Sequence, residues 1–266
     1  MAAIQMTDLT KRYGDHIAVD GLDLTVDRGE VFGFLGPNGA GKSTTINILL
    51  DFIRPTGGTA TVLGYDAQRE TRAVHERVGV LPEGYSLYDR LTGREHLRLA
   101  GRLNGCSVDV ETVLDRIGLA PADAERPAGT YSTGMGQRLA LGMATVGDPD
   151  LLVLDEPTSG LDPHGVSLLK RLVRAEADRG TTVFFSSHVL DHVEAVCDRV
   201  GILDTGRLIA VDTINGLREA VSAEMPGVEA SGTELPDELT LEALFELYTT
   251  GTDASRQQAA VPGGER

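Results

Sequence analysis

At its most informative point the sequence reads Gly36-Pro37-Asn38-Gly39-Ala40-Gly41-Lys42-Ser43. This stretch fits the phosphate-loop pattern GxxxxGK(S/T), in which a glycine-rich turn wraps backbone N–H groups around nucleotide phosphates. The pattern needs a strand before it and a helix after it. The apolar run Val31–Leu35 and the helical spacing of residues 42–52 supply both. The alternative is a glycine-rich turn that matches the pattern by chance.

The residues of this loop have distinct expected roles. The Lys42 side chain is long enough to reach the β- and γ-phosphates, and the Ser43 hydroxyl can bind Mg²⁺. The helix that starts here adds the positive end of its dipole. The predicted nucleotide-binding residues of this segment are Gly36, Asn38, Gly39, Ala40, Gly41, Lys42, Ser43 and Thr44.

An acidic pair occurs further along the chain. The apolar run Leu151–Leu154 ends in Asp155 and Glu156. Ligands of parallel sheets bind at the carboxyl ends of the strands, so we expect both carboxylates near the phosphate loop. Adjacent carboxylates can divide the chemistry, with one facing Mg²⁺ and the other facing a water molecule. The alternative is an ordinary buried strand that ends in acidic residues.

The remaining pattern predicts an α/β fold. Short apolar or alternating runs, separated by Gly, Pro and Asp, dominate the first 80 residues and predict strands. Helical spacing dominates residues 87–146, where Gly118 is a helix stop. Strand and helix patterns then alternate as far as Leu203, which is typical of a parallel sheet with helices on its faces. Asp204-Thr205-Gly206 is expected to form a hairpin turn.

The composition excludes several classes of function. The 266 residues include 40 acidic and 24 basic side chains, and the formal charge of −16 argues against a free-standing nucleic-acid binder. Two cysteines exclude a disulfide scaffold and a four-cysteine zinc site. We find no signal-peptide pattern and no apolar run near the roughly 20 residues of a membrane-spanning helix. We therefore expect a soluble cytosolic chain, so another chain must supply any membrane spans.

Most of the histidines have no partner pattern in the sequence. We expect four of them at the surface: His16, His75, His96 and His164. His188 differs from these four, because it follows the apolar run Thr182–Phe185 at a predicted strand end.

Four further segments resemble the motifs of ATP-binding cassette (ABC) proteins. Tyr131-Ser132-Thr133-Gly134-Met135-Gly136-Gln137-Arg138 resembles the signature motif, usually written LSGGQ. Asp155-Glu156-Pro157-Thr158-Ser159-Gly160-Leu161-Asp162 resembles the Walker B motif running into the D-loop. Ser187-His188 resembles the switch histidine, and Tyr13 matches the aromatic residue that stacks on adenine. The resemblance covers about residues 3–215.

This resemblance implies the architecture of a P-loop NTPase. We expect a RecA-like core with a parallel sheet, an antiparallel β subdomain, and an inserted α-helical subdomain at about residues 87–147. The cassette should span residues 1–218. An acidic extension with an amphipathic helix, carrying Leu241, Leu244, Phe245 and Tyr248, should occupy residues 219–250. Residues 251–266 are expected to form a disordered tail.

The resemblance also implies a role for each motif residue. Two cassettes dimerise head to tail in this family, and each ATP lies between the phosphate loop of one chain and the signature of the other. Ser132 and Gly134 would then contact the γ-phosphate of the opposite chain, and Asp162 would line the seam. Glu156 would be the general base, and His188 would hold the γ-phosphate. Asp155 and Ser43 would hold Mg²⁺, with Glu83 as a further ligand.

Two departures from the family pattern stand out. Glu83 occupies the position of the usual Q-loop glutamine; a carboxylate can bind Mg²⁺ or its water but cannot donate an amide proton. The signature has Thr133 for a glycine and Met135 for the glutamine. Both signature changes resemble cassettes of export-type (ABC-2-like) transporters.

Three functions are compatible with these motifs, and the first is favoured. It is the ATP-hydrolysing subunit of a membrane exporter, peripheral on the cytoplasmic face, which binds ATP and Mg²⁺ and pairs with a permease and a second cassette, either identical or different. The second is a soluble ABC ATPase that acts on ribosomes or DNA, although the net charge argues against nucleic acid. The third is a P-loop kinase of small molecules, a function that would not explain the presence of the signature motif or of the Ser187-His188 pair.

Overall fold

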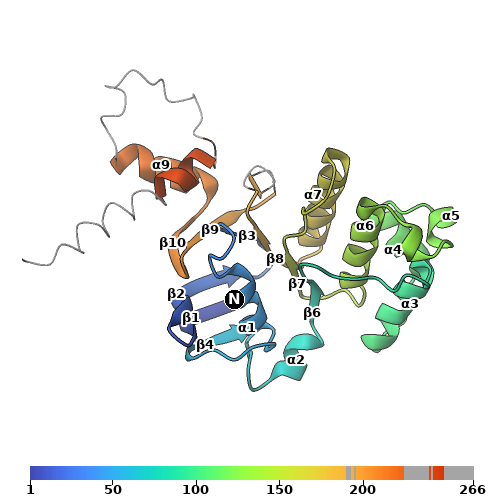
Figure 1. Ribbon diagram of the computed structural model, residues 1–266, viewed down its shortest axis with the longest axis horizontal. Helices are drawn as coiled ribbons and strands as arrows, with labels where there is room; N and C mark the ends of the chain where they lie inside the picture. Colours follow the sequence, from blue (N-terminus) through green and yellow to red (C-terminus); the bar gives the residue numbers. More distant parts are fainter. Residues whose placement is uncertain (190–192, 195, 225–239, 241, 249–266) are drawn as a thin grey trace, which may run out of the picture.

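The computed structural model describes residues 1–189, 193–194, 196–224, 240 and 242–248. Two sheets form its centre, and a helical lobe projects from one side (Figure 1). The first sheet is antiparallel, with the order β2 (His16–Asp27), β1 (Ala2–Tyr13), β4 (Gly57–Val62) and β5 (Tyr65–Asp66). Strands β1 and β2 are longer than the apolar runs that predicted them, because the alternating pattern continues through polar residues toward the hairpin between Tyr13 and His16.

The second sheet has six strands and carries the predicted motifs. Its order is β10 (Arg207–Asp212), β9 (Arg199–Asp204), β3 (Val31–Leu35), β8 (Thr182–Ser187), β7 (Leu151–Asp155) and β6 (Val78–Leu81). All neighbouring pairs are parallel except β9 and β10. The hairpin between these two turns at Thr205 and Gly206, whose φ angles of 44° and 83° suit a two-residue turn.

The helical lobe is inserted between β6 and β7. It contains α3 (Gly93–Leu103), α4 (Val110–Ile117), the short α5 (Pro121–Ala124), a 3₁₀ turn at Ala128–Thr130, and α6 (Thr133–Ala144). Local signals set these boundaries, since Thr92, Asp109 and Ser132 are N-caps and Gly118 ends α4 in the left-handed region. The segment before Gly93, which was predicted to be helical from residue 87, is instead an irregular connection with a turn at Asp89 and Arg90.

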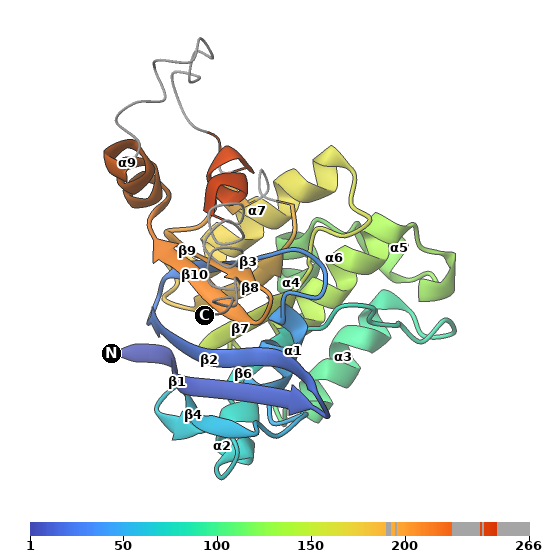
Figure 2. The same cartoon turned by 60° about the vertical axis from the view of Figure 1, so that its left-hand side comes forward.

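The other helices pack on the sheets. They are α1 (Lys42–Leu49), α2 (Thr71–His75), α7 (Pro163–Asp178) and α9 (Ile214–Glu224). Helical residues 242–248 lie beside α9 in both views (Figures 1 and 2), and Leu244 is fully buried in the same hydrophobic cluster as Leu217. The predicted helix 189–196 lies partly outside the described residues, and Leu241 and the predicted tail 251–266 lie wholly outside them.

Strand β3 separates two hydrophobic clusters. Its Val31 and Leu35 belong to the cluster that continues into the helical lobe. Its Phe32 and Phe34 face the antiparallel sheet and pack on Phe184 of β8, with ring centroids 5.8 and 5.3 Å apart. Burial on both faces explains why these strands read as continuous apolar runs. The predicted fold class is confirmed, and the carboxyl ends of β3, β7 and β8 meet at one edge.

Strand β6 lies so close to the end of α6 that its second residue has no room for a side chain. A Cβ on Gly79 would lie 1.9 Å from the carbonyl oxygen of Ala144 and 3.0 Å from Cγ of Pro149. Gly79→Ala should therefore lower the free energy of unfolding by about 1–3 kcal/mol, measured by denaturant titration.

Gly57→Ala is the matched control for this change. Its Cβ would lie 3.8 Å from Cβ of Thr10, which is an ordinary contact, so the free energy of unfolding should stay within about 0.5 kcal/mol of the parent value. Equal effects of the two substitutions would contradict the close approach of β6 and α6.

Candidate nucleotide-binding site

The phosphate loop passes from β3 directly into α1. Gly41 is the N-cap of this helix with a φ of 106°, and a Cβ there would lie 2.4 Å from the carbonyl oxygen of Ala18. Only glycine fits this combination of backbone angle and close contact. No acidic residue lies in the first turn of α1, so no carboxylate of the helix itself competes for its N-terminal N–H groups and dipole.

The hairpin of the second sheet supports the loop from behind. The Gly206 N–H donates to the carbonyl oxygen of Ala40 at 2.9 Å, and the Asp20 N–H donates to the Gly206 carbonyl at 2.9 Å. Arg207 forms an ion pair with Asp20 at 2.6 Å. The loop, the β9–β10 hairpin and strand β2 are thus joined through one residue, Gly206.

An open pocket of about 420 Å³ lies over the loop. Nine of its lining residues were predicted to bind nucleotide or Mg²⁺ or to act in catalysis: Tyr13, Asn38, Gly39, Gly41, Lys42, Ser43, Thr44, Glu83 and Glu156. The pocket is also lined by His16, Ala18 and Pro37, which the sequence did not single out. Gly36 and Ala40 belong to the loop but do not line the pocket; their carbonyl oxygens accept hydrogen bonds from Lys42 Nζ and from the Gly206 N–H.

Lys42 is almost completely buried, at 6 % exposure. Its Nζ donates to the carbonyl oxygens of Gly36 at 2.7 Å and Pro37 at 3.2 Å, and lies 3.2 Å from Oε1 of Glu156. That carboxylate oxygen is buried and receives no hydrogen bond of good geometry from the described residues. The buried Lys42 ammonium can bind a phosphate group here. The unsatisfied Glu156 oxygen can accept a hydrogen bond from a water molecule.

Glu156 has an unusual backbone conformation for a residue with a side chain. Its φ is 49°, in the left-handed region, where a non-glycine residue costs about 1–2 kcal/mol. This turn directs the carboxylate toward Lys42 rather than along the strand, and Oε2 lies 2.8 Å from Nδ1 of His188. His188 does not line the pocket directly, but it contacts the side chain that does.

Ser186, on the neighbouring strand, forms hydrogen bonds with both acidic residues. Its hydroxyl accepts a hydrogen bond from the Glu156 N–H at 3.0 Å and donates one to Oδ1 of Asp155. Sequence reasoning missed this residue. The available signal was its position: a serine at the end of the apolar run of β8, beside the strand that ends in the acidic pair.

The donor set fits a magnesium ion that is completed by phosphates. The described residues contain no group of three or more His, Cys, Asp or Glu side chains able to hold a metal ion. Mg²⁺ commonly uses one or two carboxylates together with phosphate oxygens and water. Ser43 and Glu83 line the pocket, while Asp155 is buried at the end of β7 and held by Ser186.

The signature residues lie away from this pocket. Ser132 is the exposed N-cap of α6 and accepts a hydrogen bond from the Met135 N–H at 3.3 Å. A Cβ on Gly134 would contact nothing within 4 Å. Asp162, an exposed N-cap of α7, accepts from the Gly165 N–H at 2.7 Å. None of these three lines the pocket of its own chain, so the α6 N-terminus is open to another molecule.

Two contacts fix the signature segment. Gln137, buried in α6, donates from Nε2 to the carbonyl oxygen of Pro157 at 2.9 Å, which links the signature to the segment after Glu156. The Tyr131 hydroxyl donates to the carbonyl oxygen of Asp123 at 2.8 Å, and burial raises the pKa of this phenol. Sequence reasoning assigned no role to either side chain.

The four histidines expected at the surface divide into two groups. His16, His75 and His164 are exposed. The expectation is wrong for His96, which has 0 % exposure and lies beneath the Tyr88 ring in the first turn of α3. The connection between β6 and α3, whose Tyr88 ring stacks on His96, carries no periodic pattern from which this burial could be predicted.

The chain matches known proteins along most of its length. A family model described as ABC transporter matches residues 19–159. The chain is 43% identical over 228 residues to the daunorubicin/doxorubicin resistance ATP-binding protein DrrA of Streptomyces peucetius. This alignment covers 84% of this chain and 69% of that protein. It is 40% identical over 209 residues to the bacitracin transport ATP-binding protein BcrA of Bacillus licheniformis, covering 77% and 68%.

A solved structure agrees with these matches. An ATP-binding subunit of an ABC transporter superposes with a TM-score of 0.80 and 28% identity, over 93% of this chain and 99% of that one. Among the described residues, no helix has the length and apolar character needed to cross a membrane.

The Glu156 carboxylate can be tested as the base that activates water. Glu156→Gln keeps the shape of the side chain but cannot take up a proton, so the ATPase rate should fall about 10²- to 10⁴-fold while the chain stays folded and binds nucleotide. A steady-state phosphate-release assay measures the rate. Glu242→Gln, an exposed carboxylate on the C-terminal helix, is the control. Normal turnover by Glu156→Gln would remove Glu156 from this role.

Proposed function

The chain belongs to the ABC transporter family, and from this premise we propose that it is the ATP-hydrolysing subunit of an export system, driven by ATP-dependent pairing of two cassettes. The observation that carries the nucleotide chemistry is the Lys42–Glu156–His188 arrangement above the phosphate loop. Export is supported by the relatives, one named for daunorubicin/doxorubicin resistance and another for bacitracin transport.

We derive the proposed reaction from the groups around Lys42. An ATP phosphate in the loop would be a stronger partner for the Lys42 ammonium than Glu156, because it carries more negative charge. Glu156 would then be free to accept a proton from the attacking water. His188, hydrogen-bonded to Oε2, would orient this carboxylate and hold the γ-phosphate. Mg²⁺, held through Ser43 and Asp155 with Glu83 nearby, would supply charge neutralisation of the phosphates.

The second cassette follows from the position of the signature. Ser132 and Gly134 stand at the open N-terminus of the 12-residue helix α6, which favours an anion, yet they do not line their own chain's pocket. In a head-to-tail pair, this terminus would meet the γ-phosphate bound to the opposite chain, and Asp162 would lie at the seam. The same arrangement is compatible with an identical or a different partner cassette.

The membrane partner needs a docking surface, and the helical lobe offers one. A groove of about 320 Å³ runs between β6, α3 and α6, and we call it the docking groove. Its apolar or aromatic lining side chains are Val78, Val80, Leu81, Pro82, Tyr85, Leu87, Ala100, Leu103, Ala140, Met143 and Ala144. Leu103 is 77 % exposed at its edge. Exposed large apolar side chains around a groove favour a protein partner.

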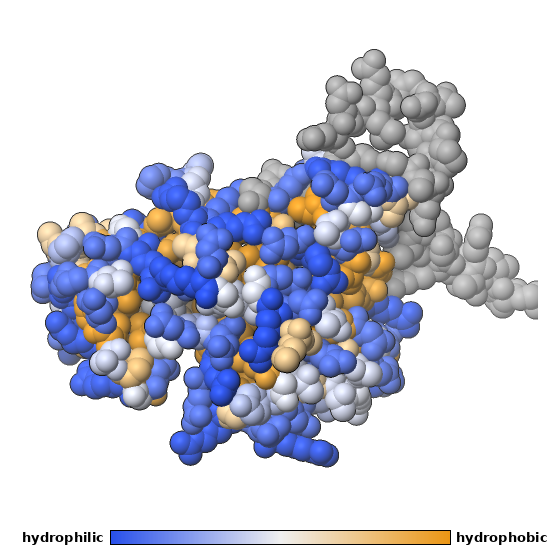
Figure 3. All heavy atoms as spheres, turned by 180° about the vertical axis from the view of Figure 1, so that it is seen from behind, coloured by the Kyte–Doolittle hydropathy of each residue, from blue (hydrophilic) through white to orange (hydrophobic). Residues whose placement is uncertain are grey.

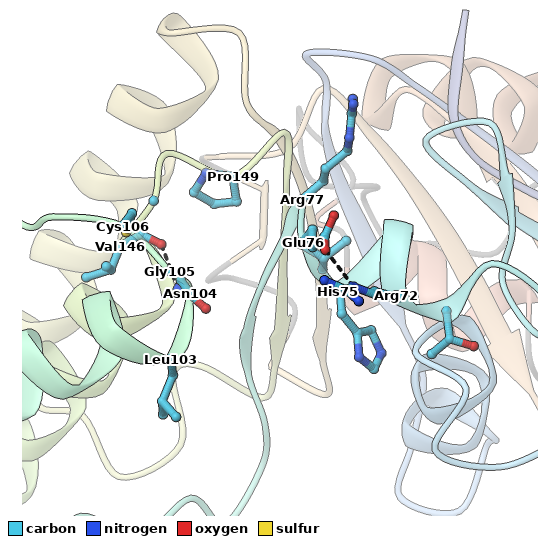
Figure 4. A pocket seen from close by; sticks show the side chains of 13 residues that line it. Arg72, His75, Glu76, Arg77, Leu103, Asn104, Gly105, Cys106, Val146 and Pro149 are labelled. Carbon is cyan, nitrogen blue, oxygen red and sulfur yellow. Dashed lines mark hydrogen bonds and ion pairs between the residues drawn. The ribbon is translucent and has the colours of Figure 1, made fainter.

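A larger cavity of about 750 Å³ adjoins this groove and shares Val78, Leu103 and Asn104 with it. Figure 4 shows its two walls, with Arg72 and His75 on the α2 side and Asn104 and Cys106 on the helical lobe. In Figure 3 a hollow is visible between the helical lobe and the neighbouring part of the molecule, on a face that is otherwise mainly hydrophilic. Together these features would accept a cytoplasmic segment of a permease, with the chain peripheral on the cytoplasmic face of the membrane.

The proposed membrane partner can be tested with the edge of the docking groove. Purification from membranes in mild detergent after crosslinking should recover a multi-spanning protein that raises ATPase activity. Leu103→Asp, which places a charge on the apolar edge, should reduce that recovery about 10-fold or more without changing nucleotide binding. Leu103→Met keeps the edge apolar and should behave as the parent does.

Other partners would give different outcomes in the same experiment. Recovery of ribosomes or DNA in place of a membrane protein would favour a soluble ABC ATPase and overturn the transport role. The net charge of −16 makes that outcome unfavourable for nucleic acid.

The paired-cassette arrangement predicts an effect of charge and bulk at the signature. Ser132→Arg, introduced into a Glu156→Gln background, should prevent ATP-dependent dimerisation while leaving nucleotide binding by the single chain intact. Light scattering with and without ATP measures the dimer. Ser107→Arg, an equivalent change at an exposed position of the same lobe, should leave dimerisation unaffected. Normal ATP-dependent dimers of the Ser132→Arg chain would contradict the arrangement.

A further inference from the structure

One face of the Tyr13 ring is occupied by a cation from the same strand. Positions 11 and 13 of β1 lie two residues apart, a spacing that places their side chains on one face of the strand. Nζ of Lys11 lies over the Tyr13 ring, 4.9 Å from its centroid. An ammonium group within about 6 Å of a ring centroid is attracted by the negative face of the π-system. This contact therefore holds the Lys11 ammonium and the Tyr13 ring together.

The Lys11 ammonium is itself fixed to the segment that follows α1. It donates a hydrogen bond to the carbonyl oxygen of Arg54 at 2.6 Å. Two further hydrogen bonds join the same pieces of chain: the Thr56 N–H donates to the Thr10 carbonyl oxygen at 2.7 Å, and the Arg12 N–H donates to Oγ1 of Thr56 at 2.9 Å. Since α1 begins at the phosphate loop, the end of β1 is connected to the helix that carries this loop.

The two side chains differ in their position relative to the nucleotide pocket. Of the described residues, Tyr13 lines this pocket and Lys11 does not. The ammonium therefore lies outside the pocket, and the pocket side of the ring is left for a ligand. Tyr13 is 49 % exposed at the end of β1, where it pairs with His16 across the hairpin. A half-exposed ring has little packing to fix its orientation, so the contact with Lys11 restricts its rotation.

We infer that Lys11 is a positioning residue, which holds the Tyr13 ring in the orientation that accepts the base of the nucleotide. A ring that is held in place before binding loses less rotational freedom when the base stacks on it, so the affinity for the nucleotide is higher. The base then lies on the ring face opposite Lys11, and the triphosphate lies over the phosphate loop. This role rests on the proposed function, because it needs a nucleotide in the pocket with its base against Tyr13.

Two substitutions separate the charge of Lys11 from its length. Lys11→Met keeps an unbranched side chain but has no cation for the ring and no donor for Arg54. Lys11→Arg keeps a cation that can lie over the ring and donate to the same carbonyl. The half-saturating concentration of MgATP, from displacement of a fluorescent nucleotide and from ATPase assays, should rise about two- to fivefold in Lys11→Met and stay close to the parent value in Lys11→Arg. The maximal ATPase rate should remain within about twofold of the parent rate in both variants.

General attraction between a basic side chain and ATP is the alternative explanation for such a change. Magnesium tripolyphosphate carries the phosphates without a base, so its affinity should be the same in Lys11→Met as in the parent chain. Arg12→Met removes one positive charge from the neighbouring exposed position and should leave the affinity for MgATP unchanged. Equal weakening of MgATP and tripolyphosphate binding by Lys11→Met would overturn the positioning role.

The dependence on the Tyr13 ring can be measured directly. In a Tyr13→Leu chain, which has no ring for the base, the further change Lys11→Met should add little to the loss of MgATP affinity. The chain has three lysines, so isotope labelling of the lysine Cε atoms gives three NMR signals, and Lys11→Met identifies the one from Lys11. The ring current of Tyr13 should shift the Lys11 ε-methylene protons upfield, and Tyr13→Leu should abolish this shift.

Defined results would overturn the role of Lys11. These are unchanged MgATP affinity in Lys11→Met, an undiminished effect of Lys11→Met in the Tyr13→Leu chain, or no upfield shift in the parent chain. An equal loss of Tm and of MgATP affinity in Lys11→Met and Lys11→Arg would also overturn it, in favour of support for the fold. Failure to recover a membrane partner would refute the export role alone, because all of these comparisons use the isolated full chain and its nucleotide.

Discussion

Two opposite charges buried side by side, Lys42 and Glu156, hold the site in its shape. Each is 6 % exposed, and neither charge could be buried alone without a cost of several kcal/mol. Their contact joins the loop after β3 to the end of β7, although β8 lies between these strands in the sheet. Strand β8 contributes Ser186 to the same place, and His188 follows it directly. The strand order therefore brings the groups together, and the ion pair keeps them together.

The motifs allowed a large part of this arrangement to be predicted, because each one is a local pattern whose position in a parallel sheet follows from general rules. Residues 36–43 had to connect a strand to a helix, and Leu151–Asp155 had to end at the same edge. The predicted stop at Gly118 matches the observed end of α4 for a similarly local reason. Family resemblance added the roles of the signature and the switch histidine, which spacing alone does not give.

Other features depend on contacts between distant segments and left no readable pattern. Ser186 matters because β8 happens to lie beside β7, and the left-handed φ of Glu156 is not marked by a glycine. The burial of His96 depends on the connection between β6 and α3, whose sequence has no helix or strand periodicity that would signal it. The docking groove likewise forms between β6, α3 and α6, which the chain reaches at widely separated points. At these positions the structure is determined by tertiary packing rather than by the local propensity of the sequence.

The three-way junction at Gly206 has a consequence for the shape of ligand that the pocket can hold. Strand β2 begins at His16, beside the aromatic ring of Tyr13, and the same strand is fastened at Asp20 to the hairpin that supports Ala40 in the phosphate loop. Tyr13, which we propose to stack on the base, and the loop, which we propose to hold the phosphates, thus belong to one continuous framework of backbone hydrogen bonds. Because their separation does not depend on a ligand, we expect the pocket to select nucleotides by their length.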